Sequence, residues 1–173
     1  MEQLIEKMHK LQASTFALYL KAHLFHWNVE GQDFHQYHEF FGDFYNEVWG
    51  SVDTTAEQIR ALGAKAKGSM TEFKELSVVR DQMSQLSIQE MNAMLHRDNE
   101  SLIAVLNEVH DEAEKQRAFG LLNYIEGRID THKKHGWMLS ASLEKKPVAE
   151  STEQPAAPLT EEVKTYILNP RDL

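Results

Sequence analysis

The chain has 173 residues, of which 42% are hydrophobic and 26% charged, with a formal net charge of −9 and no cysteine. These values are typical of one soluble globular domain, and they exclude a disulfide framework and a thiolate metal site. The net negative charge argues against a surface that binds nucleic-acid phosphates, and the lack of any apolar run of about 20 residues argues against a membrane span.

The first seven residues contain no long apolar run of the kind that a secretory signal peptide needs. The absence of cysteine also fits a reducing compartment. We therefore expect a cytoplasmic protein.

Apolar residues recur at every third or fourth position in several stretches, which predicts amphipathic helices. The first helix is expected over residues 2–28. Gly31 permits a turn after it, and Asp33 is expected to cap a second helix that begins at Phe34. Gly63 is expected to close the second helix, because glycine is favoured just past a helix end.

A long crossover follows the second helix. Two capping-box patterns of the form Ser-x-x-Glu stand at residues 69–72 and 87–90. The first predicts a short helix near residues 71–76, and the second opens a third long helix that reaches about Glu114. A fourth long helix is expected over residues 117–144.

The end of the chain differs from the rest in composition. Residues 146–158 are rich in proline and alanine and are predicted to be a flexible linker. Residues 159–173 are predicted to be a short amphipathic tail that docks on its own assembly or on a partner. Residues 1–145 would then form one helical domain.

Four residues of types that bind transition metals stand out: His26, His38, Asp53 and Glu57. His26 can reach His38 across the short turn. His38 and Asp53, however, are separated by about 22 Å on a straight helix, at about 1.5 Å per residue, so one metal ion cannot touch both. If two copies pack antiparallel around a two-fold axis, the histidines of one copy meet the carboxylates of the other. The spacing therefore indicates a metal site shared between subunits.

Two blocks of the sequence resemble the signature of a known family. They read His26-Trp27-Asn28-Val29-x-Gly31-x-x-Phe34-x-x-x-His38 and Asp53-x-x-Ala56-Glu57-x-Ile59-Arg60-x-Leu62-Gly63. This pattern resembles the signature of the Dps family, the ferritin-like proteins of DNA protection during starvation. Residues 128–139 are similar to the last helix of that family.

The resemblance implies a ferritin-like four-helix bundle with a short helix in the long crossover between helices 2 and 3. It also implies a hollow homododecamer that oxidises ferrous iron at intersubunit sites, preferably with hydrogen peroxide, and stores ferric mineral, which protects against oxidative damage. The iron ligands of the family map onto His26 and His38 of one subunit and Asp53 and Glu57 of its partner, with at most two irons per site.

One position departs from the family pattern. The family carries an aspartate four residues after the second histidine, where this chain has Gly42. Glycine supplies no ligand, so the second iron position is expected to be weaker. Two other pairs have chelating spacing. Glu6 and His9 lack the second such pair and the further glutamates of a ferritin-type di-iron site and are interpreted as solvated surface. His132 and His135 lack a carboxylate partner in the sequence and are not expected to bind metal.

Two alternatives to the ferroxidase cage remain open. One is a Dps-like shell with weak iron chemistry that acts by coating DNA. The other is a partner-recruiting protein whose tail carries the function. DNA binding is not expected, because residues 145–173 contain four Lys/Arg against five Asp/Glu.

Overall fold

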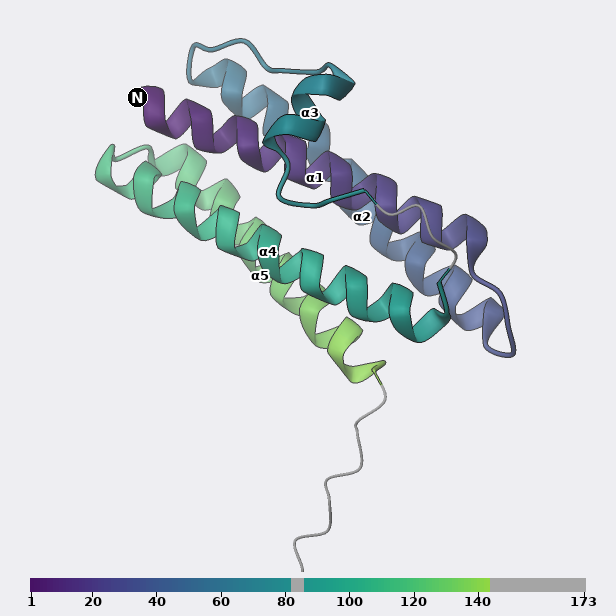
Figure 1. Ribbon diagram of the computed structural model, residues 1–173. Helices are drawn as coiled ribbons and strands as arrows, with labels where there is room; N and C mark the ends of the chain where they lie inside the picture. The colour runs from purple at the N-terminus through teal and green to yellow at the C-terminus, as the bar shows by residue number, and fades with distance from the viewer. Residues whose placement is uncertain (82–85, 144–173) are drawn as a thin grey trace, which may run out of the picture.

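The chain folds into α-helices alone in the computed structural model, which describes residues 1–81 and 86–143 (Figure 1). This part of the chain holds five helices and no strand. The helices are α1 (Glu2–Asn28), α2 (Phe34–Ala61), α3 (Met70–Leu76), α4 (Ile88–Lys115) and α5 (Phe119–Ala141). The prediction of a four-helix bundle with a short helix in the crossover is confirmed.

Two helical hairpins make up the bundle. Helices α1 and α2 pack along each other, α4 and α5 do the same, and α1 also packs against α4. The crossover runs from one end of the bundle to the other, and α3 on this crossover lies against α1. The large side chains that are fully buried in the core come from all four long helices: Leu4, Met8, Leu11, Leu18, Phe41, Ile59, Leu95, Leu102, Leu106, Ile125, His132 and Leu139.

Local sequence signals set several helix ends. Both capping boxes form, with Ser69 and Ser87 accepting the backbone N–H three residues on and Glu72 and Glu90 accepting in return. Gly63 follows the end of α2 with φ of +86°, a conformation that favours glycine.

The start of α2 differs from the expectation. Asp33 occupies the N-cap position, but its side chain makes no capping hydrogen bond. Its backbone has φ of −98° and ψ of 24° instead of the extended conformation from which an N-cap side chain reaches back. The first N–H groups of a helix have no acceptor within the helix. Here the turn supplies one acceptor, because the N–H of Phe34 donates to the carbonyl of Gly31.

The last helix is shorter than predicted. It begins at Phe119 and not at residue 117, because Arg117 takes φ of +55° in the turn after α4. It ends at Ala141, and Glu144 lies outside the described residues. The predicted linker and tail, residues 146–173, also lie outside them.

A buried ion pair joins the two hairpins. Lys21 of α1 donates to Asp98 of α4, and neither side chain is more than 6% exposed. Arg97 pairs with the other carboxylate oxygen of Asp98 from the surface. Since a charge buried without a partner is costly, a shift of α1 along α4 that separated this pair would destabilise the fold. None of the described helices is both long and apolar enough to cross a membrane.

Candidate metal site at the α1–α2 turn

The turn between α1 and α2 brings two histidines together. Val29 ends α1 with an extended backbone and a buried side chain. Gly31 has φ of +118°, which L side chains rarely adopt, so the chain can reverse direction within a few residues. His26 in the last turn of α1 therefore faces His38 in the first turns of α2.

The two imidazole rings are stacked, with centroids 3.7 Å apart and planes inclined by 21°. Their hydrogen bonds are reciprocal. The Nδ1 atom of His26 lies 2.7 Å from the carbonyl oxygen of His38, and the Nδ1 atom of His38 lies 2.8 Å from the carbonyl oxygen of His26. The prediction that His26 reaches His38 across the turn is thus met by the structure.

These contacts fix the tautomer of each neutral ring. A carbonyl oxygen only accepts hydrogen bonds, so both Nδ1 atoms must donate. In a neutral imidazole the lone pair then lies on Nε2, and neither Nε2 has a hydrogen-bond partner among the described residues. Histidines that bind metals are commonly held in this way, with the non-ligating nitrogen donating to a backbone carbonyl. Both rings are therefore prepared to bind a metal through Nε2.

Gly42 lies directly beside this pair. It is buried, and a Cβ atom added there would be 3.3 Å from both Cε1 and Nδ1 of His26. The His26 ring thus lies in tight contact with the place where a side chain at position 42 would begin. The structure offers no carboxylate here, and the neighbouring Asp43 is exposed.

Asp53 and Glu57 lie further along α2 and are exposed. Within residues 1–81 and 86–143 no group of three or more His, Asp or Glu side chains is arranged to hold a metal ion. One chain therefore brings the two histidines together but leaves the two carboxylates apart from them.

A cluster of aromatic rings surrounds the histidine pair, and sequence periodicity did not single it out. His23 stacks on Tyr45 with centroids 4.0 Å apart, and its Nδ1 atom lies 3.2 Å from the hydroxyl of Tyr19. Burial, together with the positive charge that His26 can carry, lowers the pKa of His23. The signal that could have found the cluster is the spacing of Tyr19, His23 and His26 on one face of α1.

One histidine of each of the two other chelating pairs, His132 and His9, bonds to another part of the chain. His132 is buried, and its Nδ1 atom lies 2.8 Å from the Oδ1 atom of Asn99. Burial, and then the charge of Arg128, hold its pKa well below the usual range. The Nε2 atom of His9 lies 3.0 Å from the carbonyl oxygen of Lys65.

An apolar groove of about 560 Å³ lies beside the site, between α1 and the crossover. Its walls include Phe16, Leu20 and Leu24 of α1 and Phe73 of α3. Trp27, at the end of the groove, is 59% exposed.

Residues 5–147 match the ferritin-like domain family. The fold and this match define the chain as a ferritin-like protein.

Relatives narrow the assignment. The chain is 32% identical over 140 residues to the DNA protection during starvation protein of Brevibacillus brevis, which covers 79% of this chain and 92% of the relative. The structure of this chain resembles that of Dps from Staphylococcus aureus, with a TM-score of 0.81 and 27% sequence identity. The match covers 84% of this chain and 98% of that chain. The chain belongs to the Dps family.

A more distant structure shares the fold. The Dps protein of Vibrio cholerae O1 is described as a member of a broad superfamily of ferritin-like diiron-carboxylate proteins. It has a TM-score of 0.78 and 21% identity to this chain, and the match covers 81% of this chain and 88% of that chain.

Proposed function

We propose that the protein is a ferroxidase and iron-storage cage. It oxidises ferrous iron with hydrogen peroxide at sites shared between subunits and stores the ferric product inside a cytoplasmic homododecamer, which protects the cell from oxidative damage. The observation that carries this proposal is the stacked pair of His26 and His38, in which both Nδ1–H groups are bound to backbone carbonyls and both Nε2 atoms are left for a metal.

The separation along α2 supports sharing between two copies. His38 and Asp53 lie about 22 Å apart along a straight helix, so the carboxylates of the same chain cannot reach the iron. In an antiparallel pair of subunits, Asp53 and Glu57 of one copy approach the histidines of the other, and two equal sites form.

The surface around the site supports the same arrangement. The groove of Phe16, Leu20, Leu24 and Phe73 is mostly apolar. Trp27, next to His26, and Trp49, further along α2, are more than half exposed. A second copy seated on this face would remove these side chains from water. At about 25 cal/mol per Å² of buried apolar surface, such burial is a substantial driving force for pairing.

Each ligand has a chemical role. The neutral imidazoles of His26 and His38 suit ferrous iron, and carboxylates bind the harder ferric ion more strongly after oxidation. Asp53 would bridge or hold the iron, and Glu57 would hold it terminally. Because Gly42 has no carboxylate to offer, a second iron would bind more weakly than the first. Two ferrous ions would supply the two electrons that reduce hydrogen peroxide to water, so oxidation of a pair of irons would release no hydroxyl radical.

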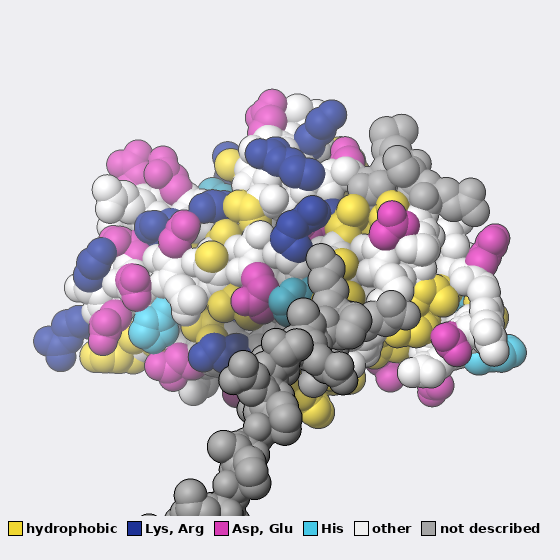
Figure 2. Space-filling model, turned by 60° about the horizontal axis from the view of Figure 1, so that its bottom comes forward, with side chains coloured by type: hydrophobic (Ala, Val, Ile, Leu, Met, Phe, Trp, Pro, Cys, Tyr) yellow, Lys and Arg dark blue, Asp and Glu magenta, His cyan; other side chains and the backbone are white. Residues whose placement is uncertain are grey.

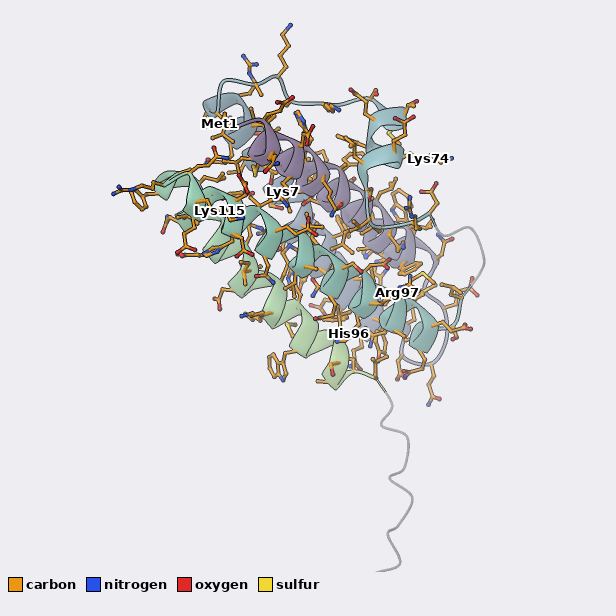
Figure 3. The ribbon with its side chains drawn as sticks, turned by 60° about the vertical axis from the view of Figure 1, so that its left-hand side comes forward. Met1, Lys7, Lys74, His96, Arg97 and Lys115 are labelled. Atoms are coloured by element: carbon orange, nitrogen blue, oxygen red, sulfur yellow. The ribbon has the colours of Figure 1, made fainter. Side chains whose placement is uncertain are left out.

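Anaerobic ferrous titration followed by a peroxide pulse tests this function. Wild type is expected to bind one or two irons per subunit and to oxidise them faster than His38→Ala does. The matched control is His96→Ala, which should behave as wild type. His96 lies on α4, in the other hairpin (Figure 3). Equal rates for wild type, His38→Ala and iron in buffer would refute the proposal.

DNA coating is the competing function, and the charge distribution does not favour it. Figure 2 shows basic and acidic side chains interspersed on the face in view. The cations labelled in Figure 3, Lys7, Lys74, Arg97 and Lys115, are dispersed over α1, α3 and α4. We expect no retention of DNA in a gel shift at about 150 mM salt. Retention at that salt concentration would favour the DNA-coating alternative.

A further inference from the structure

The described part of the chain ends near the apolar groove. The hydroxyl of Tyr37, near the start of α2, donates to the carbonyl oxygen of Ser142 at 3.3 Å. The end of α5 therefore lies at the same end of the bundle as the α1–α2 turn (Figure 1). Trp27, in the last turn of α1, lines the groove at this end. The remaining residues, 144–173, thus continue from a point close to the groove.

The chain is long enough to return to the groove. Between Leu143 and Leu159 it can extend about 50 Å, at about 3.3 Å per residue. Two helices side by side are about 20 Å wide, so this length spans the bundle from α5 to α1. The predicted tail, residues 159–173, can therefore reach every part of the groove.

The apolar pattern of the tail fits the groove in length. Four of its apolar residues recur at helical spacing: Leu159, Val163, Tyr166 and Ile167. A helix through them would place all four on one side, over about 12 Å. The groove follows α1 from Phe16 to Trp27, which is about 17 Å on a helix. Proteins commonly bind an amphipathic helix by laying its apolar side into such a groove.

The charges at the groove suit the same segment. Lys74 and Arg80 are exposed there and outnumber Asp81. At about 100° per residue, Glu162 lies beside the apolar stripe of the tail. A docked tail would thus bring an acidic side chain to a basic edge, and such complementarity favours this segment over an uncharged one.

We propose that residues 159–173 dock in the groove of their own subunit before subunits pair, and that pairing requires their release. This inference rests on the pairing face of the proposed function, because the second copy would cover the same groove. The tail and the second copy cannot both cover Leu20, Leu24 and Phe73. A subunit whose tail is docked is therefore closed to pairing.

Tethering lets a weak contact compete with a second copy. A segment on a short linker is present at an effective concentration of about 1 mM, so a contact with a Kd of about 1 mM would fill about half of the grooves. Only about one quarter of encounters would then join two open grooves, and loss of the contact should raise the rate of pairing about fourfold.

Disulfide trapping tests the contact. The chain has no cysteine, so two introduced cysteines report on one contact. The full chain with Leu20→Cys and Val163→Cys is refolded from urea and oxidised while it assembles. Non-reducing gels then separate a link within one chain, which we expect, from a link between two chains. The matched control replaces Leu20→Cys by Ala104→Cys, on the exposed side of α4, and should link more slowly.

Light scattering during the same refolding measures the effect on pairing. Ile167→Asp puts a charge into the apolar stripe of the tail and should assemble about fourfold faster than wild type. Thr165→Asp is the matched control, because it adds the same charge away from that stripe, and it should assemble as wild type does. Both substitutions leave the core residues of α1 to α5 unchanged.

Two results would overturn the proposal. One is a link between two chains, or a link within one chain that forms no faster than in the Ala104 control. The other is an equal assembly rate for Ile167→Asp and wild type, since a tail that does not slow pairing does not compete with the second copy.

Ferrous oxidation by the assembled cages separates this inference from the proposed function. If both effects of the tail appear but iron is not oxidised, the ferroxidase function fails and the role of the tail stands. If iron is oxidised and neither effect appears, the role of the tail fails alone.

Discussion

His26 and His38 each donate the Nδ1–H group to the backbone carbonyl of the other, and their rings stack with centroids 3.7 Å apart. The end of α1 and the beginning of α2 thus hold each other in place through the same two side chains that offer Nε2 to a metal. Little reorganisation is needed when a metal arrives, which strengthens binding.

Gly42 and Gly50 provide a comparison within α2. Alanine at Gly50, where no atom lies within 4 Å of an added Cβ, should raise the free energy of unfolding by about 1 kcal/mol. Alanine at Gly42 should lose that gain, because its methyl group meets the His26 ring at 3.3 Å, and it should weaken ferrous binding. Urea unfolding and calorimetric iron titration measure the two effects. Equal stabilisation with unchanged iron affinity would contradict a dependence of the His26 ring on this space.

Lys21 tests the ion pair between the hairpins. Lys21→Met leaves Asp98 buried with only Arg97 beside it, and the free energy of unfolding should fall by about 3 kcal/mol. The control is Lys10→Met. Its partner Glu108 is 44% exposed, so the loss should be below about 1 kcal/mol. If denaturant unfolding gave similar losses for both variants, the buried pair would not stabilise the bundle in this way.

His132 should make the fold sensitive to acid. Its pKa is lowered in the folded state, first by burial, so below its unfolded pKa of 6.5 the unfolded chain binds the additional proton. The contribution of neutral His132 to the free energy of unfolding is therefore fully present above pH 6.5 and is lost as the pH falls below that value. The urea midpoint of wild type should fall between about pH 7.5 and about pH 5.5, a range centred on the unfolded pKa of histidine. In His132→Gln this fall should be smaller.

Exposed His35 is the control for that experiment, and His35→Gln should follow the wild-type pH dependence. His135 adds to the same trend, because burial lowers its pKa too, although the carboxylate of Glu47 opposes the shift. An unchanged slope in His132→Gln would assign the acid sensitivity to other groups.

Helix positions could be predicted from the sequence because their signals are local. Capping boxes, helical periodicity and Gly63 located most ends within two residues. The helix after Asp33 begins at Phe34 as predicted, but the expected side-chain cap is missing, and α5 begins two residues later than predicted. Both differences depend on turn conformations that a residue type alone does not determine.

The candidate site was predictable in part. The proximity of His26 and His38 follows from the short turn, but their stacking and carbonyl contacts depend on how α1 and α2 pack. The contact of Gly42 with the His26 ring arises from the same packing and has no signature in residue spacing. The spacing of Tyr19, His23 and His26 places their rings on one face of α1, but the stacking of His23 on Tyr45 depends on how α1 and α2 pack.

The sharing of a site between subunits is the central claim, and mixed assembly tests it most directly. His38→Ala and Asp53→Ala are prepared separately, each expected to be nearly inactive, and are then co-assembled in equal amounts. With random pairing around the two-fold axis, about one quarter of the sites would unite an intact His38 with an intact Asp53. Iron oxidation should therefore return to about one quarter of the wild-type rate. If the mixture forms cages but is no more active than the two separate variants, the site is not shared.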